Sequence, residues 1–245
     1  MTDDPYGDEE LVGLYDLDNP AGADHAYYRA LAARARKVLD FGCGTGLLTR
    51  SLVAPGRAVI GVDPSPTMLG YARRQPGADA ITWIEGDFRA VEQTADADLV
   101  VSTGNTIMHI GNQAEVFTAL AGALSPGGVI SFESRNPAAR AWEQWTREST
   151  YGERDTPVGH LVEWLDLLEV ADGRVVFDAH NVFPDGHDAV YRNTLHFRSP
   201  EAISTDLSEA GFTDITVSGG WHQEPVTDES RLLVFHATKL PGHQP

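Results

Sequence analysis

The sequence predicts an α/β fold in which helices cover both faces of a mostly parallel sheet, with an antiparallel β insert late in the chain. Three observations support this. The segment Lys37–Phe41 (KVLDF) ends in a glycine cluster, which is typical of a buried strand followed by a tight turn. Strand-like and helix-like segments alternate as far as residue 135, which favours parallel pairing. The later strand-like runs are joined by Asp172-Gly173 and Pro184-Asp185-Gly186, which are hairpin signals.

The first half of the chain, residues 22–135, supplies the alternating elements. An Ala-rich helix comes first, the Pro55-Gly56 turn ends the helix after the first strand, and residues 125–128 form the turn before the fifth strand. Helices are expected over residues 22–35, 47–53, 66–74 and 113–124. Strands are expected over residues 37–41, 57–62, 81–84, 98–102 and 129–133.

The second half departs from this alternation. Residues 136–199 are expected to form a helix over 137–147 and an antiparallel meander of strands over 161–170, 174–183 and 189–198, which we expect to cap a substrate site. Residues 200–245 return to the main sheet, with a helix over 200–210 that ends at Gly211 and strands over 213–218 and 231–238. Because no repeat or low-complexity linker interrupts the chain, a single domain over residues 1–245 is expected.

The glycines that follow the first strand define a ligand loop. Gly42, Gly44 and Gly46 let the backbone turn tightly and approach a ligand. A dinucleotide-binding loop would have its third glycine where Leu47 stands, and no Gly-Lys-Ser/Thr follows for a phosphate-binding loop. Asp63 ends the second strand, where an acid accepts hydrogen bonds from ribose hydroxyls. The loop and the acid together indicate an adenosine-like ligand without a pyrophosphate.

Three motifs, VLDFGCGTG, VIGVDPSPTML and WIEGDF, resemble the cofactor motifs of class I S-adenosylmethionine-dependent methyltransferases. The resemblance runs over roughly residues 25–135 and returns in the last two strands. It implies a Rossmann-like sheet of seven strands with an antiparallel last strand. It also implies S-adenosyl-L-methionine as the cofactor and S-adenosyl-L-homocysteine as the product.

The same resemblance implies which residues hold the cofactor. Asp40 would help to hold its amino group, Asp63 would bind the ribose, and Asp87 would accept a hydrogen bond from the adenine amino group. Thr103 or Gly104 would line the methyl donor. The full set expected to bind the cofactor is Tyr28, Asp40, Gly42, Cys43, Gly44, Gly46, Asp63, Pro64, Met68, Asp87, Phe88, Thr103 and Gly104.

Two residues are expected to be catalytic. His109 follows the fourth strand and Tyr15 precedes the first expected helix. This arrangement resembles bacterial small-molecule N-methyltransferases of the amino-sugar and glycine type, in which the matching Tyr and His face the substrate amine. A histidine is a suitable base near neutral pH. Simple packing of the loop by His109 and of a lid by Tyr15 remains the alternative.

Substrate contacts are expected beyond the fourth and fifth strands. Tryptophan faces would favour a cationic substrate, although plain core packing is the alternative for these side chains. The expected substrate-binding residues are Asn105, Arg135, Asn136, Trp142 and Trp145.

Composition narrows the class of partner. The chain has 36 acidic and 18 basic residues, a formal net charge of −18. Such a surface repels nucleic acid and anionic membranes, so a small-molecule substrate is expected. Cys43 is the single cysteine, no zinc-binding spacing exists, and no metal site is expected. The acidic start of the chain lacks a signal-peptide pattern, so we expect a cytoplasmic protein, as a monomer or a homodimer.

Other functions stay open at this stage. The acceptor atom is nitrogen or oxygen, with nitrogen favoured. A non-catalytic protein that binds S-adenosylmethionine as a sensor or scaffold is one alternative. An aminopropyl transferase is another, although it needs acids where Thr103-Gly104-Asn105 stand.

Overall fold

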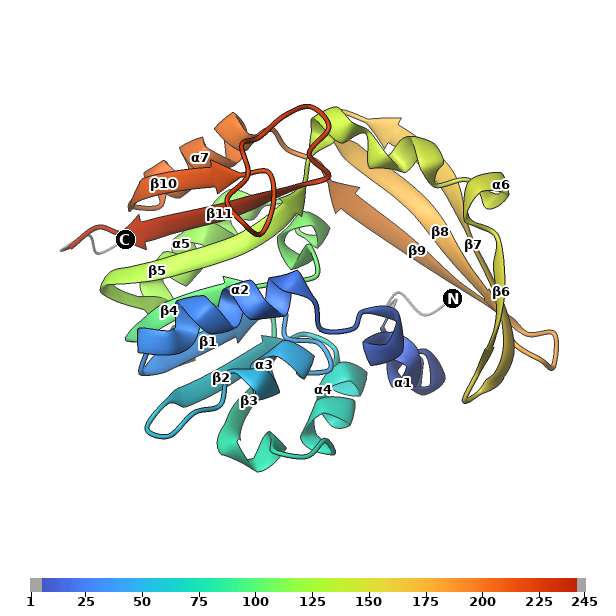
Figure 1. Ribbon diagram of the computed structural model, residues 1–245, viewed down its shortest axis with the longest axis horizontal. Helices are drawn as coiled ribbons and strands as arrows, with labels where there is room; N and C mark the ends of the chain where they lie inside the picture. Colours follow the sequence, from blue (N-terminus) through green and yellow to red (C-terminus); the bar gives the residue numbers. More distant parts are fainter. Residues whose placement is uncertain (1–5, 242–245) are drawn as a thin grey trace.

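The computed structural model describes residues 6–241, apart from the side chain of Gln93, and contains two sheets (Figure 1). The larger has seven strands in the order β10-β11-β5-β4-β1-β2-β3. Its strands are β1 (Lys37–Phe41), β2 (Ala58–Asp63), β3 (Ile81–Glu85), β4 (Ala97–Ser102), β5 (Leu124–Arg135), β10 (Phe212–Ser218) and β11 (Leu232–Lys239). Strands β1 to β5 pair in parallel, and β11 is antiparallel to both of its neighbours. The predicted fold class is confirmed.

Two of the helices around this sheet begin at a serine cap. Ser65 and Ser199 accept hydrogen bonds from the backbone N–H groups of Met68 and Ala202, and a proline follows each serine at the first helical position. The helices are α1 (Glu9–Asp18), α2 (Ala23–Leu31), α3 (Leu47–Ser51), α4 (Pro66–Arg73), α5 (Gln113–Ala123), α6 (Arg147–Thr150) and α7 (Pro200–Glu209). None of the helices within residues 6–241 is long and apolar enough to cross a membrane.

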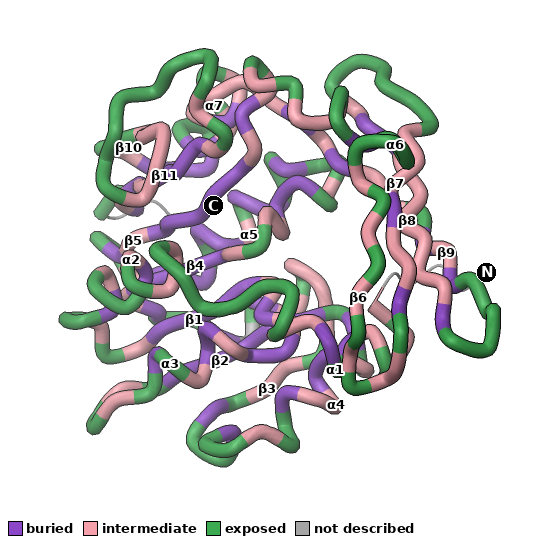
Figure 2. The backbone as a smooth tube through the Cα atoms, turned by 45° about the vertical axis from the view of Figure 1, so that its right-hand side comes forward, coloured by how far each residue is buried: buried purple, intermediate pink, exposed green. Residues whose placement is uncertain are grey.

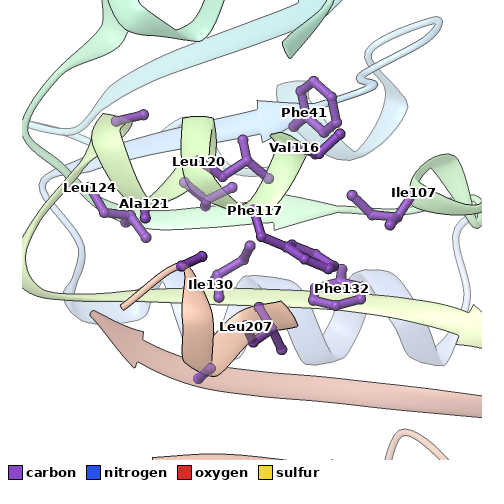
Figure 3. Packing of buried hydrophobic residues seen from close by; sticks show 14 of the residues in the cluster. Phe41, Ile107, Val116, Phe117, Leu120, Ala121, Leu124, Ile130, Phe132 and Leu207 are labelled. Carbon is purple, nitrogen blue, oxygen red and sulfur yellow. The ribbon is translucent and has the colours of Figure 1, made fainter. Parts of the chain in front are cut away.

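The main core lies between the large sheet and helices α5 and α7 (Figures 2 and 3). Phe132 on β5 stacks on Phe235 of β11 at a ring-centroid distance of 4.9 Å and meets Phe117 of α5 at 5.3 Å. A second cluster around Tyr28 and Leu52 covers the opposite face. Each large apolar side chain buried in this way contributes roughly 1.5–3 kcal/mol, so the sheet is a rigid base for the loops at its strand ends.

The smaller sheet is an antiparallel meander with the order β6-β7-β8-β9. Its strands are β6 (Gly152–Thr156), β7 (Gly159–Ala171), β8 (Arg174–Val182) and β9 (Asp188–His196). Helix α1 lies between the two sheets in Figure 1, where buried Leu14 packs among Leu161, Phe183 and Tyr191 of the meander. The insert between β5 and β10 is therefore tied to the large sheet through α1.

Several expected elements differ from the structure. The helix expected over 137–147 is wrong, because Arg140 adopts a left-handed backbone (φ 46°) that separates two 3₁₀ turns, 137–139 and 141–144, ahead of α6. The first expected helix is α-helical only to Leu31. Strand β6 and helix α1 were not predicted. Helix α1 buries only Val12 and Leu14, so its sequence lacks a clear apolar stripe.

Candidate active site

A cleft opens at the carboxyl ends of β1, β2, β3 and β4, where open α/β sheets bind ligands. Its main cavity has a volume of about 380 Å³. A second cavity of about 260 Å³ adjoins it, and Gly42, Gly44 and Gly104 border both. The main cavity is lined by Tyr6, Tyr15, Phe41, Gly42, Gly44, Asp63, Pro64, Met68, Asp87, Phe88, Gly104, Thr106, His109, Ile110 and Gly111.

The glycine loop after β1 is held open by backbone conformations that favour glycine. Gly42, Gly44 and Gly46 have φ angles of +72°, +52° and +72°. A Cβ atom on Gly42 would stand 2.2 Å from Cγ2 of Thr106, and one on Gly46 would meet Trp83 at 2.4 Å. At Gly44 the nearest atom would be Sδ of Met68, at 3.9 Å. Close packing therefore requires glycine at 42 and 46, whereas Gly44 exposes bare backbone to the cleft.

Asp63 fixes the far side of this loop. Its carboxylate accepts hydrogen bonds from the backbone N–H groups of Gly44 at 2.8 Å and Ser65 at 2.9 Å. The side chain also lines the main cavity, where a bound ligand would meet its carboxylate. The position at the end of β2 matches the ribose contact that the sequence resemblance implies.

Asp40 lies buried beneath the loop. One carboxylate oxygen accepts a hydrogen bond from the Thr49 hydroxyl at 2.7 Å, and the other, Oδ1, has no hydrogen-bond partner among the described residues. Burial, the largest cause, raises the pKa of Asp40 to about 7. A buried acceptor without a partner suits a cationic amino group, so this end of the site fits the amino-acid part of S-adenosylmethionine.

The adenine side of the cleft is mostly apolar. Pro64, Met68 and Phe88 line it. Asp87 caps the turn that begins at Phe88, accepts a hydrogen bond from the N–H group of Arg89 at 2.9 Å, and also pairs with the Arg89 guanidinium. Apolar walls with one carboxylate at the rim fit a heteroaromatic ring with an amino group.

Three aromatic rings gather at the mouth of the cleft. The ring of Tyr6 meets Tyr15 of α1 and His109 edge-on, each at a centroid distance of 6.2 Å. The Tyr15 hydroxyl lies over the end of β4, 3.6 Å from where a Cβ on Gly104 would stand. The chain neighbours of two of these rings are buried and hold them in place. Leu14, which precedes Tyr15, packs against apolar side chains of the meander. In the same way Met108, which precedes His109, packs against apolar side chains of the insert.

The protonation states of these rings follow from their surroundings. Burial among the cleft walls, and then the positive charge of Arg135, lower the pKa of His109 to about 4, although the ring stays open to solvent on the cleft side. Burial and then the carboxylate of Asp63 raise the pKa of Tyr15. At neutral pH the imidazole is therefore uncharged, with one nitrogen able to accept a hydrogen bond, and the phenol keeps its proton.

Glu133 supports the loop that leads to His109. It is buried at the end of β5, where it accepts hydrogen bonds from the Tyr28 hydroxyl at 2.6 Å and from the backbone N–H of Asn105 at 3.0 Å. Burial raises the pKa of Glu133 to about 7. Tyr28 thus holds Glu133 from behind the strand ends and does not line either cavity.

The structure brings together most of the residues that the sequence predicts. Beyond the main cavity, the smaller one is lined by Cys43 and Thr103. Asp40, Gly46 and Asn105 lie beside or beneath the loops. Four of the predicted substrate residues, those at and after the end of β5, line neither cavity. Arg135 stacks on Trp145 at 5.6 Å, Trp142 packs on Phe197 at 4.5 Å, and Asn136 donates a hydrogen bond to the carbonyl of Thr227 at 3.0 Å.

Sequence reasoning missed several residues that line the cleft. Tyr6 stands in an acidic segment where no element was expected. Asp16 and Thr45 line the smaller cavity, where the Thr45 hydroxyl donates a hydrogen bond to the Asp16 carboxylate. Thr106 borders both cavities, and its place three residues before His109 was the available signal. No group of three or more His, Cys, Asp or Glu side chains within residues 6–241 is arranged to hold a metal ion.

Comparison with known proteins gives consistent similarities. Residues 38–128 match the family described as "Methyltransferase domain". An uncharacterized methyltransferase of Mycobacterium tuberculosis is 36% identical over 174 residues, which cover 64% of this chain and 69% of the relative. A ubiquinone biosynthesis O-methyltransferase of Pectobacterium atrosepticum is 27% identical over 182 residues, 68% of this chain and 75% of the relative. Among solved structures, the sugar N-methyltransferase KedS8 of Streptoalloteichus superposes with a TM-score of 0.75 at 18% identity, covering 98% of this chain and 96% of the other.

Proposed function

Because this chain belongs to the class I S-adenosylmethionine-dependent methyltransferases, we propose that it methylates an amine nitrogen of a small molecule. One observation carries the choice of nitrogen. At the mouth of the cleft, the ring of Tyr6 contacts both an uncharged His109 and a protonated Tyr15. The glycine loop and Asp63 line the same cleft. These groups suit the recognition of N–H donors.

When bound, S-adenosylmethionine supplies an electrophilic methyl group on a sulfonium. The chain then has two tasks: to align the nucleophile and to exclude water. The neutral imidazole of His109 accepts a hydrogen bond from the acceptor N–H and so orients the nitrogen, and the proton of the methylated ammonium leaves to solvent. The Tyr15 oxygen accepts a second N–H, so that the nitrogen lone pair points into the cleft.

Other residues hold the cofactor in this proposal. Asp63 binds the ribose hydroxyls, and Asp40 receives the amino group at its unpaired oxygen. Pro64, Met68 and Phe88 enclose the adenine. Gly44 has no side chain, so the protein backbone can lie close to the part of S-adenosylmethionine that joins the ribose to the amino acid.

The test is transfer of a labelled methyl group from S-adenosylmethionine to a panel of primary amines, secondary amines and phenols, together with calorimetric titration. Asp63→Ala should lose cofactor binding, whereas His109→Ala should keep it and lose turnover. Transfer to phenols alone would refute the choice of nitrogen. Binding without transfer to any acceptor would favour a sensor or scaffold.

We further infer that the enzyme works in the cytoplasm as a monomer or homodimer. The single cysteine, Cys43, is buried and unpaired, as suits a reducing compartment. Size-exclusion chromatography with light scattering distinguishes the two oligomeric states.

A further inference from the structure

A third cavity, of about 180 Å³, lies next to the mouth of the cleft, between α1 and one face of the meander. It shares Tyr6, Tyr15 and Met68 with the cofactor cleft. A ligand in this cavity would therefore reach the same aromatic rings that we place around the acceptor nitrogen.

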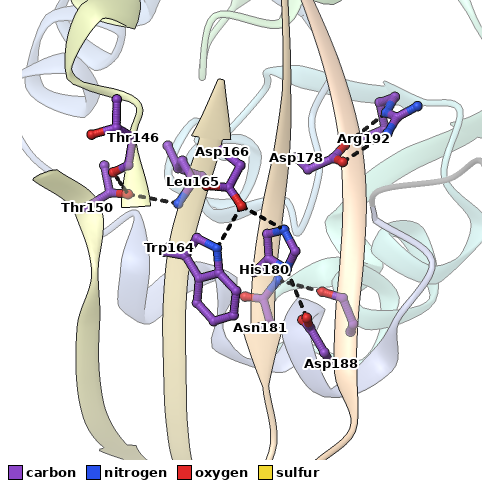
Figure 4. Close-up of polar contacts among 11 residues, drawn as sticks. Thr146, Thr150, Trp164, Leu165, Asp166, Asp178, His180, Asn181, Asp188 and Arg192 are labelled. Carbon is purple, nitrogen blue, oxygen red and sulfur yellow. Dashed lines mark hydrogen bonds and ion pairs between the residues drawn. The ribbon is translucent and has the colours of Figure 1, made fainter. Parts of the chain in front are cut away.

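The meander side of the cavity is a set of alternating residues on three neighbouring strands: Glu163 of β7, Ala179 and Asn181 of β8, and Tyr191 and Asn193 of β9. Glu163 pairs directly with Asn181, and Ala179 with Tyr191. Since successive strand residues point to opposite faces, their sequence neighbours lie on the other side of the sheet. There Arg192 forms an ion pair with Asp178, and His180 contacts Asp166 and Asp188 (Figure 4).

The two asparagines present acceptor atoms to this cavity. The Nδ2 group of Asn181 donates to the carbonyl of Ala189 at 3.3 Å, and that of Asn193 donates to the carbonyl of Tyr191 at 3.2 Å. Each bond fixes the orientation of its amide. No other side-chain hydrogen bond of these asparagines occurs within residues 6–241, so each amide oxygen is available to a hydroxyl or amine donor.

The cavity is also negatively charged. Asp18 and Glu163 line it and share a single counter-ion, Arg154, at 2.5 Å and 2.6 Å. No lysine or arginine of the described chain lines the cavity itself. Two carboxylates against one guanidinium leave one negative charge, which attracts a cation and opposes a phosphate or carboxylate.

We propose that this cavity, the acceptor subsite, binds the body of the acceptor and selects a compact, hydroxylated amine without phosphate or carboxylate groups. The inference rests on the proposed function and adds the substrate class. Asn181 and Asn193 accept hydrogen bonds from the acceptor hydroxyls. The excess negative charge favours the positive charge that the nitrogen gains as the methyl group leaves the sulfonium.

The test uses matched acceptors: ethanolamine against phosphoethanolamine, glucosamine against its phosphate ester, and cyclohexylamine as an amine without hydroxyls. We expect kcat/KM to be at least ~10-fold higher for each unphosphorylated partner, as one repelled charge near a low-dielectric wall predicts. Equal or better use of the phosphate esters overturns the proposal, and so does the methylation of neither amines nor phenols by protein that binds S-adenosylmethionine.

Variants separate the subsite from the rest of the enzyme. Asn181→Ala and Asn193→Ala should each raise KM for the hydroxylated amine about 3- to 10-fold, the loss of one hydrogen bond, with cofactor affinity unchanged. Arg192→Gln, which alters the other face of β9 beside Asn193, is the control and should leave KM unchanged. If Asn181→Ala and Asn193→Ala change KM no more than Arg192→Gln does, the proposed subsite is refuted. If only phenols are methylated, the choice of nitrogen fails, and the same variants still test the subsite through KM for the phenol.

Discussion

The contact between Gly42 and Thr106 gives a sharp test of how the glycine loop is built. Gly42 has a φ angle of +72°, and an added Cβ would stand 2.2 Å from Cγ2, 2.5 Å from Oγ1 and 2.8 Å from Cβ of Thr106. Gly56 is the matched control. Its φ angle is +76°, and a Cβ there would meet nothing within 4 Å.

Both alanine variants place a side chain on a left-handed backbone, but only Gly42→Ala also displaces Thr106. A left-handed alanine costs roughly 1–2 kcal/mol, offset by about 0.4–1 kcal/mol because alanine restricts the unfolded chain. Gly56→Ala should therefore lower the free energy of unfolding by about 1 kcal/mol. Gly42→Ala adds forced displacement of Thr106, an overpacking cost of about 1–3 kcal/mol, for a total of about 2–4 kcal/mol.

Urea unfolding followed by tryptophan fluorescence measures both variants, with calorimetric titration of S-adenosylmethionine in parallel. Because Thr106 leads to His109, we expect Gly42→Ala also to weaken cofactor binding at least ~10-fold, and Gly56→Ala to leave it unchanged. In a Thr106→Gly background the extra cost of Gly42→Ala should disappear. Equal destabilisation by the two alanines, within ~0.5 kcal/mol, would refute the reasoning.

The remaining predictions concern charge and catalysis. His109→Ala should lower kcat about 100-fold, because the acceptor nitrogen loses the contact that orients it, while the dissociation constant for S-adenosylmethionine changes less than about twofold. Rapid-quench assays and calorimetry measure the two, and an unaltered kcat contradicts the assigned role. Because the pKa of His109 is about 4, its charge is constant above pH 6, so the wild-type kcat profile should have no inflection near pH 6.5. Burial raises the pKa of Glu133 from 4.5 to about 7, so the folded protein keeps a proton that the unfolded chain has released, and its free energy of unfolding should fall as pH rises between these values. In Glu133→Gln this slope should be shallower in urea titrations from pH 5 to pH 8, and an identical slope would argue against a buried, protonated Glu133. Arg154→Met should lower the free energy of unfolding by no more than about 1 kcal/mol, because the ion pairs are about one-third exposed, yet it should increase the preference for cationic over neutral acceptors in competition assays.

The sequence alone determined the elements of the large sheet and the cofactor loop. Strand β1 was predicted residue for residue, and α4, α5 and α7 to within one residue, because apolar periods, the prolines that start α4 and α7 and the glycine that follows α7 are local signals. Gly42, Gly44 and Asp63 were found for the same reason. Each stands directly at a strand end, where the chain's own conformation places it in the cleft.

Tertiary packing decided the rest. The strand register places Asn181 and Asn193 on one face of the meander, and the docking of Leu14 against Leu161 and Phe183 turns that face toward the cleft. Trp142 and Trp145 looked like a substrate wall, yet both pack on Phe197, because a left-handed Arg140 breaks the expected helix. Side chains far apart in sequence meet only after the insert and α1 have docked, and the free energy of that docking depends on complementary surfaces that no local pattern encodes.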